Sequence, residues 1–349
     1  MNDDIPDATP ATPPPVPQTP QGTQPIRIEM RQPRGGSLIG RLFVGLVSSV
    51  LIISIVLNVY LLTMVSASVG TSIRTQVVTE GNPGETIALY DVQGMITPDQ
   101  ARRFDLFARE VIAEDDVKAV VIRVNSPGGA VAPSDEMNAA MNRLKAAGKT
   151  VVVSMGGVAA SGGYYLSAPA HDIYAEPTTI TGSIGVISQM PILVGTMEKI
   201  GMEMVVMRSE QAKEYKAGLN PFEHPTDQVK AEFQEMLNTI QGLFVQAVTE
   251  GRSMLTAEEV AALSNGKVWV GTEAKAKKLV DAIGYLADAI DGAGSRAGLM
   301  RPHVVRYQPR YSLMQMVLGA KASEGAGVTI DADLLDELQT PRVLMLWRP

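Results

Sequence analysis

The segment "VKAVVIRVNSPGGAVAPSDEMNAAMNRLKAAGKTVVVSMGG" (Val117–Gly157) decides the fold. It begins with an apolar, β-branched run at 117–125 and passes through a glycine-containing turn into an amphipathic helical stretch at 132–148. A second apolar run follows at 149–157. Two buried strands joined through a helix form a βαβ unit, in which the strands lie parallel in one sheet.

The same alternation continues on both sides of this segment. Apolar runs without polar alternation are interleaved with amphipathic stretches, which is typical of a parallel sheet covered by helices on both faces. We therefore predict an α/β fold with a parallel-sheet core. Further predicted elements are a strand at 202–208, a long helix at 227–252, a helix at 311–322 and a terminal strand at 340–349.

The composition excludes several classes of chemistry. The 349 residues carry a formal net charge of −7 and no lysine- or arginine-rich run, so nucleic-acid binding is not expected. The absence of cysteine excludes a disulfide, a thiolate nucleophile and Cys-bound zinc. The three histidines, His171, His224 and His303, are too scattered for a histidine-based metal site, and no cofactor is expected.

An apolar segment near the N-terminus predicts a membrane anchor. The proline-rich residues 1–41 are expected to be disordered or PPII-like, and the 24 residues of 42–65 carry no charge. About 20 apolar residues span a bilayer as a helix, so 42–65 is expected to cross the membrane lipid once. A buried core helix is the alternative. Arginines are concentrated before this segment, which predicts a cell-membrane protein with a cytoplasmic N-terminus and an extracytoplasmic domain after the segment.

These boundaries divide the chain into five predicted parts. The parts are a cytoplasmic tail (1–41), a transmembrane helix (42–65), a linker (66–84), the α/β domain (85–295) and a C-terminal extension (296–349). Contact with other subunits is the role expected for the extension.

A candidate nucleophile lies in "GGVAASGGYYLSAPA" (Gly156–Ala170). Ser161 stands among small residues just before an apolar stretch that is expected to begin a helix. Many nucleophilic serines are presented in this way, because small neighbours let a substrate approach the backbone. Close packing between a strand and a helix is the structural alternative.

Two further loops are expected at the same edge of the sheet, where ligands bind beyond the carboxyl ends of the strands. "NSPGG" (Asn125–Gly129) follows a buried strand, and its glycines permit positive φ and expose backbone N–H groups, as an oxyanion hole requires. "TITGSIGV" (Thr179–Val186) combines hydroxyl residues and glycines between apolar runs. A tight turn and a turn followed by a strand are the respective structural alternatives.

A nucleophilic serine needs a proton acceptor, and the histidines are poorly placed for that role. His171 is expected to cap a helix or lie on the surface, His224 lies in a proline-flanked loop, and His303 is expected in a peripheral segment. Lysine is the known alternative base. A lysine base must be largely neutral near pH 7, so its pKa must lie about 3 below that of a free lysine. Lowering the pKa this far costs about 4 kcal/mol, and burial of the amine can supply that free energy. Lys213 and Lys216 follow the strand predicted at 202–208, and spacing does not choose between them.

Four motifs, in order, resemble signal peptide peptidase A, a family of membrane-bound serine–lysine peptidases. The motifs are "RVNSPGG", "AASGGYYLSAPA", "TTITGSIGV" and "GKVWVGTEAKAKKLVDAIG", all within residues 84–295. The resemblance implies a fold shared with the Clp protease proteolytic subunit and the crotonases. It also implies the short form of the family, with a single serine-bearing repeat.

The resemblance assigns roles to five residues of this sequence. Ser161 matches the nucleophile, and Lys213 matches the general base because "RSEQAKE" corresponds to the family's lysine segment. Ser183 matches a serine that hydrogen-bonds the lysine amine and orients it. Gly128 and Gly129 match the backbone oxyanion site.

Glu210 and Glu214 flank Lys213 and are expected to point outward, since either carboxylate, folded over the amine, would hold the proton on it. One chain carries both Ser161 and Lys213, so each protomer is expected to be able to hold a complete dyad. The resemblance further implies a ring-like homo-oligomer at the membrane. Its substrates would be hydrophobic, extended peptides such as cleaved signal peptides.

Two other functions are compatible with the same fold. A crotonase-like acyl-CoA enzyme would share the paired backbone donors, but it would need a nucleotide site and no anchor. A non-catalytic peptidase-fold scaffold would bind membrane proteins or peptides and would be expected to lack the serine or the lysine. Both residues are present, so misplacement of Lys213 would be the feature that favours the scaffold.

Overall fold

The computed structural model describes residues 38–68, 73–213, 215–216, 218–309 and 342–347. The chain divides into two compact units, Met1–Val65 and Ser66–Pro349, and each is described here by itself. Most of the expected cytoplasmic tail and the helix predicted at 311–322 lie outside the described residues.

The first unit is represented by helix α1 (Leu38–Ser68). Within the described residues one stretch, Leu42–Leu61, is long and apolar enough to cross a membrane, and none of it is buried by the rest of the chain. Its polar side chains bond to carbonyls one turn earlier: Ser49 Oγ donates to Gly45 O at 2.9 Å and Asn58 Nδ2 to Ser54 O at 2.7 Å. These two donors are therefore bonded within the helix itself. A helix over 42–65 is confirmed, and its crossing of a membrane stays a prediction.

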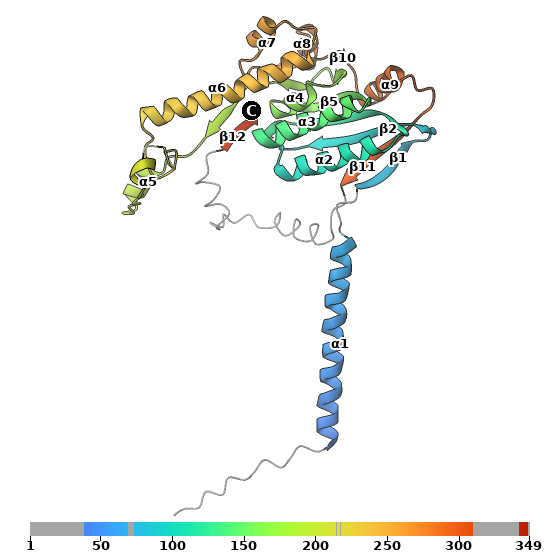
Figure 1. The fold of residues 1–349 in the computed structure, drawn as a ribbon, viewed down its shortest axis with the longest axis vertical. Coiled ribbons are helices and arrows are strands. Elements are labelled where there is room, and N and C mark those ends of the chain that lie inside the picture. Colours follow the sequence, from blue (N-terminus) through green and yellow to red (C-terminus); the bar gives the residue numbers. More distant parts are fainter. Residues whose placement is uncertain (1–37, 69–72, 214, 217, 310–341, 348–349) are drawn as a thin grey trace, which may run out of the picture. The chain divides into compact units, whose positions relative to one another are not determined.

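The second unit is built on a sheet in which the described strands follow the order β1-β11-β2-β3-β5-β6-β10, with β7 beside β5 and β9 beside β7 (Figure 1). The central strands are parallel, whereas β1 is antiparallel to β11 and β9 is antiparallel to β7. The α/β class with a parallel core is confirmed. The strands are β1 (Ile73–Thr79), β2 (Asn82–Gln93), β3 (Val117–Ser126), β5 (Thr150–Ala160), β6 (Asp172–Ala175), β7 (Ile180–Gly182), β9 (Val268–Val270), β10 (Ala282–Ile283) and β11 (Pro302–Pro309).

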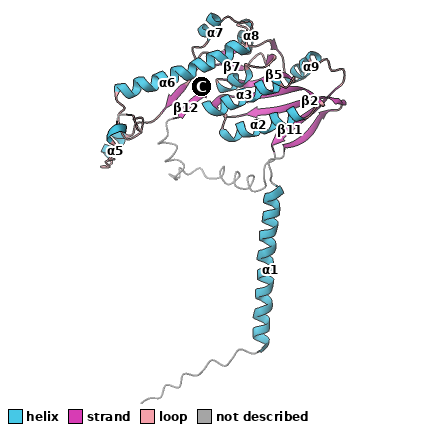
Figure 2. Cartoon of the chain, viewed as in Figure 1, coloured by secondary structure: helices cyan, strands magenta, loops and turns pink. Residues whose placement is uncertain are grey.

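A small second sheet contains three antiparallel strands among the described residues, in the order β4-β12-β8. The helices cover both faces of the large sheet (Figure 2). The small-sheet strands are β4 (Gly128–Ala130), β8 (Ile187–Gln189) and β12 (Arg342–Leu346). The helices are α2 (Pro98–Ala113), α3 (Val131–Ala146), α4 (Gly162–Ser167), α5 (Val194–Lys199), the 3₁₀ turn η1 (Glu210–Ala212), α6 (Asp227–Gly251), α7 (Ala257–Leu263), α8 (Gly271–Ala276) and α9 (Leu286–Arg296).

Alternate side chains of each central strand enter two separate cores. On β2, Ala88, Tyr90 and Val92 belong to the cluster that contains the buried residues of α2 and α3. Ile87 and Leu89, on the same strand, belong to the cluster that contains those of α9. Because both faces of the sheet are covered, both sets must be apolar, which explains the continuous apolar runs in the sequence.

An aromatic group anchors α2 to the sheet. The ring of Phe107 stacks on Tyr90 at 4.5 Å between centroids and meets Tyr307 edge-on at 5.4 Å. Phe104 completes the group, at 5.4 Å from Tyr90. Tyr90 is on β2 and Tyr307 on β11, so the group joins one helix to two neighbouring strands.

Helix α6 packs on the domain through its C-terminal half. Phe244 and Val248 are buried, and the Phe244 ring meets Tyr165 of α4 edge-on at 4.9 Å. Towards its N-terminal end apolar side chains such as Met236 remain partly exposed. Figure 1 shows α5 beyond that end of α6, away from the large sheet.

Two expectations about local structure are wrong. The segment 202–208, predicted as a buried strand, has no regular structure, and Met202, Val205 and Met207 are 56%, 72% and 87% exposed. Its apolar residues find no neighbouring strand in the described part of the chain, and a strand needs a partner for its backbone hydrogen bonds. Residues 66–84, predicted as a linker, contain β1 and the start of β2.

The aromatic group generates a stability prediction. Phe107→Ala removes three ring contacts and leaves a cavity in the core, so the free energy of unfolding is expected to fall by about 3–5 kcal/mol. Leu243→Ala is the matched control, since Leu243 is 55% exposed and its truncation is expected to cost about 0.5 kcal/mol or less. Urea unfolding of the two purified chains in detergent measures both values. Equal losses would show that the aromatic group does not anchor α2.

Candidate active site

Ser161 occupies a one-residue turn between β5 and α4. Its backbone has φ 54° and ψ −117°, a conformation that residues other than glycine rarely adopt and that costs about 1–3 kcal/mol. Two hydrogen bonds hold it: Ser161 N donates to Gly182 O, and Tyr165 N donates to Ser161 O, each at 2.8 Å. A strained serine at a strand-to-helix turn is the geometry in which nucleophilic serines are presented. Ser161 is 1% exposed.

The loop after β7 lies against Ser161. Besides the bond to Gly182, Ser161 Oγ lies 3.5 Å from the carbonyl oxygen of Gly185, a long hydrogen bond. Ser183, between those two glycines, also has positive φ, 51°, and its N–H donates to Lys267 O at 2.9 Å. The structure therefore brings Ser161 and the Ser183 loop together, as the sequence predicted.

The "NSPGG" loop approaches the other side of Ser161. Gly128 has φ 97°, and a Cβ there would overlap the carbonyl oxygen of Met345 and lie 2.7 Å from the nitrogen of Gly162. A Cβ on Gly162 would lie 3.2 Å from Gly128 Cα. Both positions must therefore be glycine for the two backbones to come this close.

The backbone N–H groups of this loop have different partners. Gly128 N donates to Ser126 Oγ at 3.1 Å, within the loop itself. Gly129 is paired with Met345 of β12, and Trp347 N, two residues further along, donates to Pro127 O at 2.8 Å. Hydrogen-bonded pairs recur every second residue in an antiparallel ladder, so Gly129 N–H faces the Met345 carbonyl. Two glycines were expected at an oxyanion site. The N–H of Gly129 points at a carbonyl oxygen, whereas the N–H of Gly128 is bonded within its own loop.

The sequence analysis missed Gly162 as a possible second donor. Gly162 follows Ser161 directly, and a Cβ on it would lie 3.1 Å from the Met345 carbonyl oxygen. In serine hydrolases the N–H of the residue after the nucleophile often belongs to the oxyanion hole, so the position of Ser161 alone was a sufficient signal.

Lys213 is not brought to Ser161. It follows η1, its side chain is 67% exposed, and Nζ donates to Glu210 Oε1 at 2.6 Å. The expectation that Glu210 points away from the amine is therefore wrong, because at i and i+3 of a helical turn the two side chains are neighbours. Glu214 lies outside the described residues. Lys216 is also exposed, so burial does not distinguish the two candidate lysines.

A buried lysine does occur in the domain, at the opposite end of β5. Lys149 is 7% exposed, burial lowers its pKa, and Nζ donates to Glu114 O and Val117 O at 2.7 and 2.8 Å. It precedes β5, whereas Ser161 follows it, and a strand of that length spans about 35 Å at roughly 3.3 Å per residue. Lys149 therefore stabilises the β3–β5 region and cannot serve Ser161.

Two of the histidines differ from the expectations. His171 neither caps a helix nor lies on the surface, because it is half-buried against β5, and His303 lies in β11, between β1 and β2 in the sheet, with its side chain 14% exposed. His171 Nδ1 accepts a hydrogen bond from Val151 N at 3.0 Å, and burial lowers the pKa of the imidazole. His303 Nδ1 lies 3.9 Å from Glu80 Oε2, on the β1–β2 side of the domain. The hydrogen bonds of Ser161 within the described residues involve no histidine.

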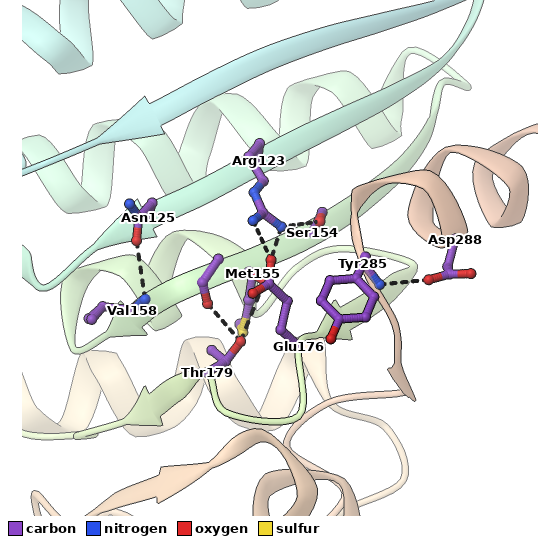
Figure 3. A network of polar contacts seen from close by, with 10 residues as sticks. Arg123, Asn125, Ser154, Met155, Val158, Glu176, Thr179, Tyr285 and Asp288 are labelled. Atoms are coloured by element: carbon purple, nitrogen blue, oxygen red, sulfur yellow. Dashed lines mark hydrogen bonds and ion pairs between the residues drawn. The ribbon is translucent and has the colours of Figure 1, made fainter.

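A polar network fixes the strand ends that support these loops (Figure 3). Arg123 of β3 donates to Ser154 Oγ of β5 at 2.8 Å and forms an ion pair with Glu176, in the turn before β7. Thr179 Oγ1 donates to Gly156 O at 2.6 Å. The bonds join β3, β5 and the segment that leads to Ser183, so they set the position of all three loops.

Comparisons with known proteins agree on one family. Residues 143–300 match Peptidase family S49. The chain is 36% identical over 210 residues to Protease 4 of Salmonella typhi, covering 60% of this chain and 33% of that protein, so it spans about a third of that relative. It is 32% identical over 270 residues to a putative signal peptide peptidase SppA of Enterococcus faecium, covering 73% of this chain and 77% of the relative. A probable protease SohB of Buchnera aphidicola is 34% identical over 197 residues, covering 53% of this chain and 57% of the relative.

The strained turn generates a prediction that needs no activity assay. Ser161→Gly is expected to be more stable than Ser161→Ala by about 1 kcal/mol, because glycine adopts φ 54° without the Cβ penalty. At the neighbouring position, where φ is ordinary, Ala160→Gly is expected to lower the free energy of unfolding by about 1 kcal/mol. Thermal or urea unfolding of the three variants shows whether glycine, compared with alanine, raises the free energy of unfolding at position 161 and lowers it at position 160. The same sign at both positions would contradict backbone strain at Ser161.

Proposed function

The chain belongs to peptidase family S49, and on that premise we propose that it is a membrane-anchored serine endopeptidase acting on hydrophobic peptides through a Ser161–Lys213 dyad. The observation that carries the proposal is the convergence at Ser161. A strained serine, two close glycine backbones and the carbonyl of an extended strand meet there. Acyl transfer needs this set of groups: a nucleophile, backbone donors and a carbonyl between them.

The proposed reaction is acyl transfer through an ester. Neutral Lys213 takes the Ser161 proton while Oγ attacks the peptide carbonyl. The N–H groups of Gly129 and Gly162 stabilise the tetrahedral oxyanion, and the positive φ of Gly128 keeps the loop close enough for this. Lys213 then protonates the leaving amine, and water hydrolyses the acyl-enzyme by the same route. Ser183 would orient the lysine amine.

The dyad requires Lys213 to leave Glu210 and reach Ser161. Both side chains of the Lys213–Glu210 ion pair are exposed. Exposed ion pairs contribute little to stability, so separating Lys213 from Glu210 costs little free energy. The lysine would arrive either by rearrangement of the irregular segment 202–209 or from a second copy of the chain in the proposed homo-oligomer. The exposed Lys213–Glu210 pair is also the observation that favours the second candidate function, a non-catalytic scaffold that binds peptides or membrane proteins.

The proposed substrates are extended apolar peptides such as cleaved signal peptides. β12 supports this choice, because Leu344, Met345 and Leu346 are all buried where they lie beside β4 and β8. The proposed location is the cell membrane, with α1 crossing it, the N-terminus in the cytoplasm and the peptidase domain outside. A ring-like homo-oligomer is the proposed assembly.

Four single variants test the dyad. Ser161→Ala and Lys213→Ala are expected to lower kcat/KM for a hydrophobic fluorogenic peptide by about a thousandfold or more, since they remove the nucleophile and the base. Lys213→Arg is expected to be equally inactive, because arginine keeps the charge but cannot accept the proton. Lys216→Ala is the matched control and is expected to retain activity.

Two outcomes would change the proposal. Full loss in Lys216→Ala, with activity in Lys213→Ala, would move the base to Lys216 and leave the enzyme class intact. A folded wild-type chain that cleaves no peptide, with and without residues 342–349, would favour the scaffold. Mixing and reassembling Ser161→Ala and Lys213→Ala chains distinguishes the two routes for the lysine, because activity returns only if serine and lysine act between copies.

A further inference from the structure

The Ser183 loop is bonded to the turn that precedes β9. Ser183 N donates to Lys267 O at 2.9 Å, and Gly266 N donates to Ile184 O at 3.1 Å. These main-chain bonds run in both directions and continue the antiparallel pairing of β7 with β9 beyond the end of β7. Because Ser183 has φ 51°, the loop is strained, and bonds of this kind are needed to keep its shape.

The same turn packs against the part of the loop that contacts Ser161. A Cβ on Gly185 would lie 3.3 Å from Gly266 Cα, so the two backbones are close, and the Gly185 carbonyl oxygen lies 3.5 Å from Ser161 Oγ. At the other end of the loop, Gly182 O accepts the hydrogen bond of Ser161 N at 2.8 Å. A displacement of the turn would therefore disturb the loop that contacts both Oγ and the backbone of the nucleophile.

The side chain of Asn265 gives the turn its shape. Its Oδ1 accepts a hydrogen bond from Lys267 N at 3.0 Å, which is an Asx-turn, in which asparagine closes a turn on the backbone two residues further along. Its Nδ2 donates to Ala262 O at 3.1 Å, one of the last carbonyls of α7, which a helix leaves without a partner of its own. Between these two bonds the chain reverses at Gly266, with φ 78°.

Helix α6 adds a second link to the same turn. Gln241 Nε2 donates to Ser264 O at 3.2 Å and lies 3.5 Å from Ile184 O, so one amide group bridges the turn and the Ser183 loop. Ser183, Gln241 and Asn265 all line one cavity of about 350 Å³ beside the loop. The turn, the loop and α6 are therefore joined in one polar network next to the nucleophile.

We propose that Asn265 is a positioning residue for the peptidase reaction. Its Asx-turn fixes the Lys267 carbonyl that holds Ser183, and so keeps the Ser183 hydroxyl where it orients the lysine amine towards Ser161. This inference rests on the proposed function, in which Ser183 has that orienting role. A displacement of about 1 Å in such a constellation costs about a hundredfold in rate, so a turn that merely loosens is enough to slow the reaction.

Two substitutions of Asn265 test the Asx-turn. Asn265→Ala removes the acceptor for Lys267 N, and kcat for a hydrophobic fluorogenic peptide is expected to fall by about ten- to a hundredfold with KM changed by about twofold or less. Asn265→Asp is expected to keep most of the activity, because a carboxylate oxygen accepts the same hydrogen bond. Both variants are measured as full-length chains in detergent.

Asn238→Ala is the matched control. Asn238 lines the same cavity, but its Oδ1 accepts a hydrogen bond from Gln234 Nε2 within α6, away from the turn. Its truncation is expected to leave kcat and KM like those of the wild type. Urea unfolding of each variant confirms that the measured chains are folded, so that a lower kcat reports on positioning.

Amide hydrogen exchange tests the same inference without an activity assay. The peptide that covers residues 183–186 contains the Ser183 N–H that Lys267 O accepts. In Asn265→Ala this peptide is expected to exchange about tenfold faster than in the wild type, because the turn that protects it opens more often. Asn265→Asp and Asn238→Ala are expected to exchange at the wild-type rate.

The two measurements separate failure of this inference from failure of the proposed function. If the wild type cleaves the peptide while Asn265→Ala matches it in kcat and in exchange, the inference is overturned and the proposed function stands. Equal losses in Asn265→Ala and Asn265→Asp would overturn it too, since the Asx-turn would then not be what holds the loop. If the folded wild type cleaves nothing, the proposed function fails, and exchange alone decides whether Asn265 fixes the Ser183 loop.

Discussion

The conformation of Ser161 is the constraint on which the rest of the site depends. β5 has to end and α4 has to begin within one residue, which requires positive φ at a position that carries a side chain. The bonds to Gly182 O and from Tyr165 N hold that conformation, and the buried strand and helix on either side supply the packing that offsets its cost. With a relaxed backbone at this residue, the hydroxyl would move away from the Gly185 carbonyl, which lies 3.5 Å from Oγ. The strained backbone therefore fixes the direction of the Ser161 side chain.

Backbone proximity is the second feature of the site. Gly128 and Gly162 bring a loop and a helix start so close that no side chain fits between them, and the Met345 carbonyl lies in the same place. The surface around Gly128 and Gly162 is consequently made of main-chain groups, and in the proposed function these groups would bind the main chain of an extended peptide. The cavity of about 350 Å³ beside it has a mixed lining, in which Ile184 and Leu237 lie with Gln241 and Asn265.

The lysine segment behaves differently from the rest of the domain. Residues 202–209 are apolar in sequence yet exposed and irregular in a single chain, and Lys213 is paired with a carboxylate at the surface. In contrast, Ser161, Ser183 and the glycine loop are buried and joined to the sheet by the Arg123–Glu176 network. Ser161 is therefore held by buried contacts with the sheet, whereas Lys213 is on an exposed segment that the Arg208–Glu223 ion pair joins to the rest of the chain.

The sequence by itself determined the α/β class, the apolar N-terminal helix and the three loops at the sheet edge. Each of these depends on local pattern: periodicity or chain-breaking glycines. Only the tertiary structure decided that β1 and β11 join the sheet, that 202–208 forms no strand, that Glu210 covers Lys213, and that β12 lies beside Gly129. These features depend on which distant segments meet, and an apolar run looks the same whether it is buried in its own domain, exposed, or bound between two other strands.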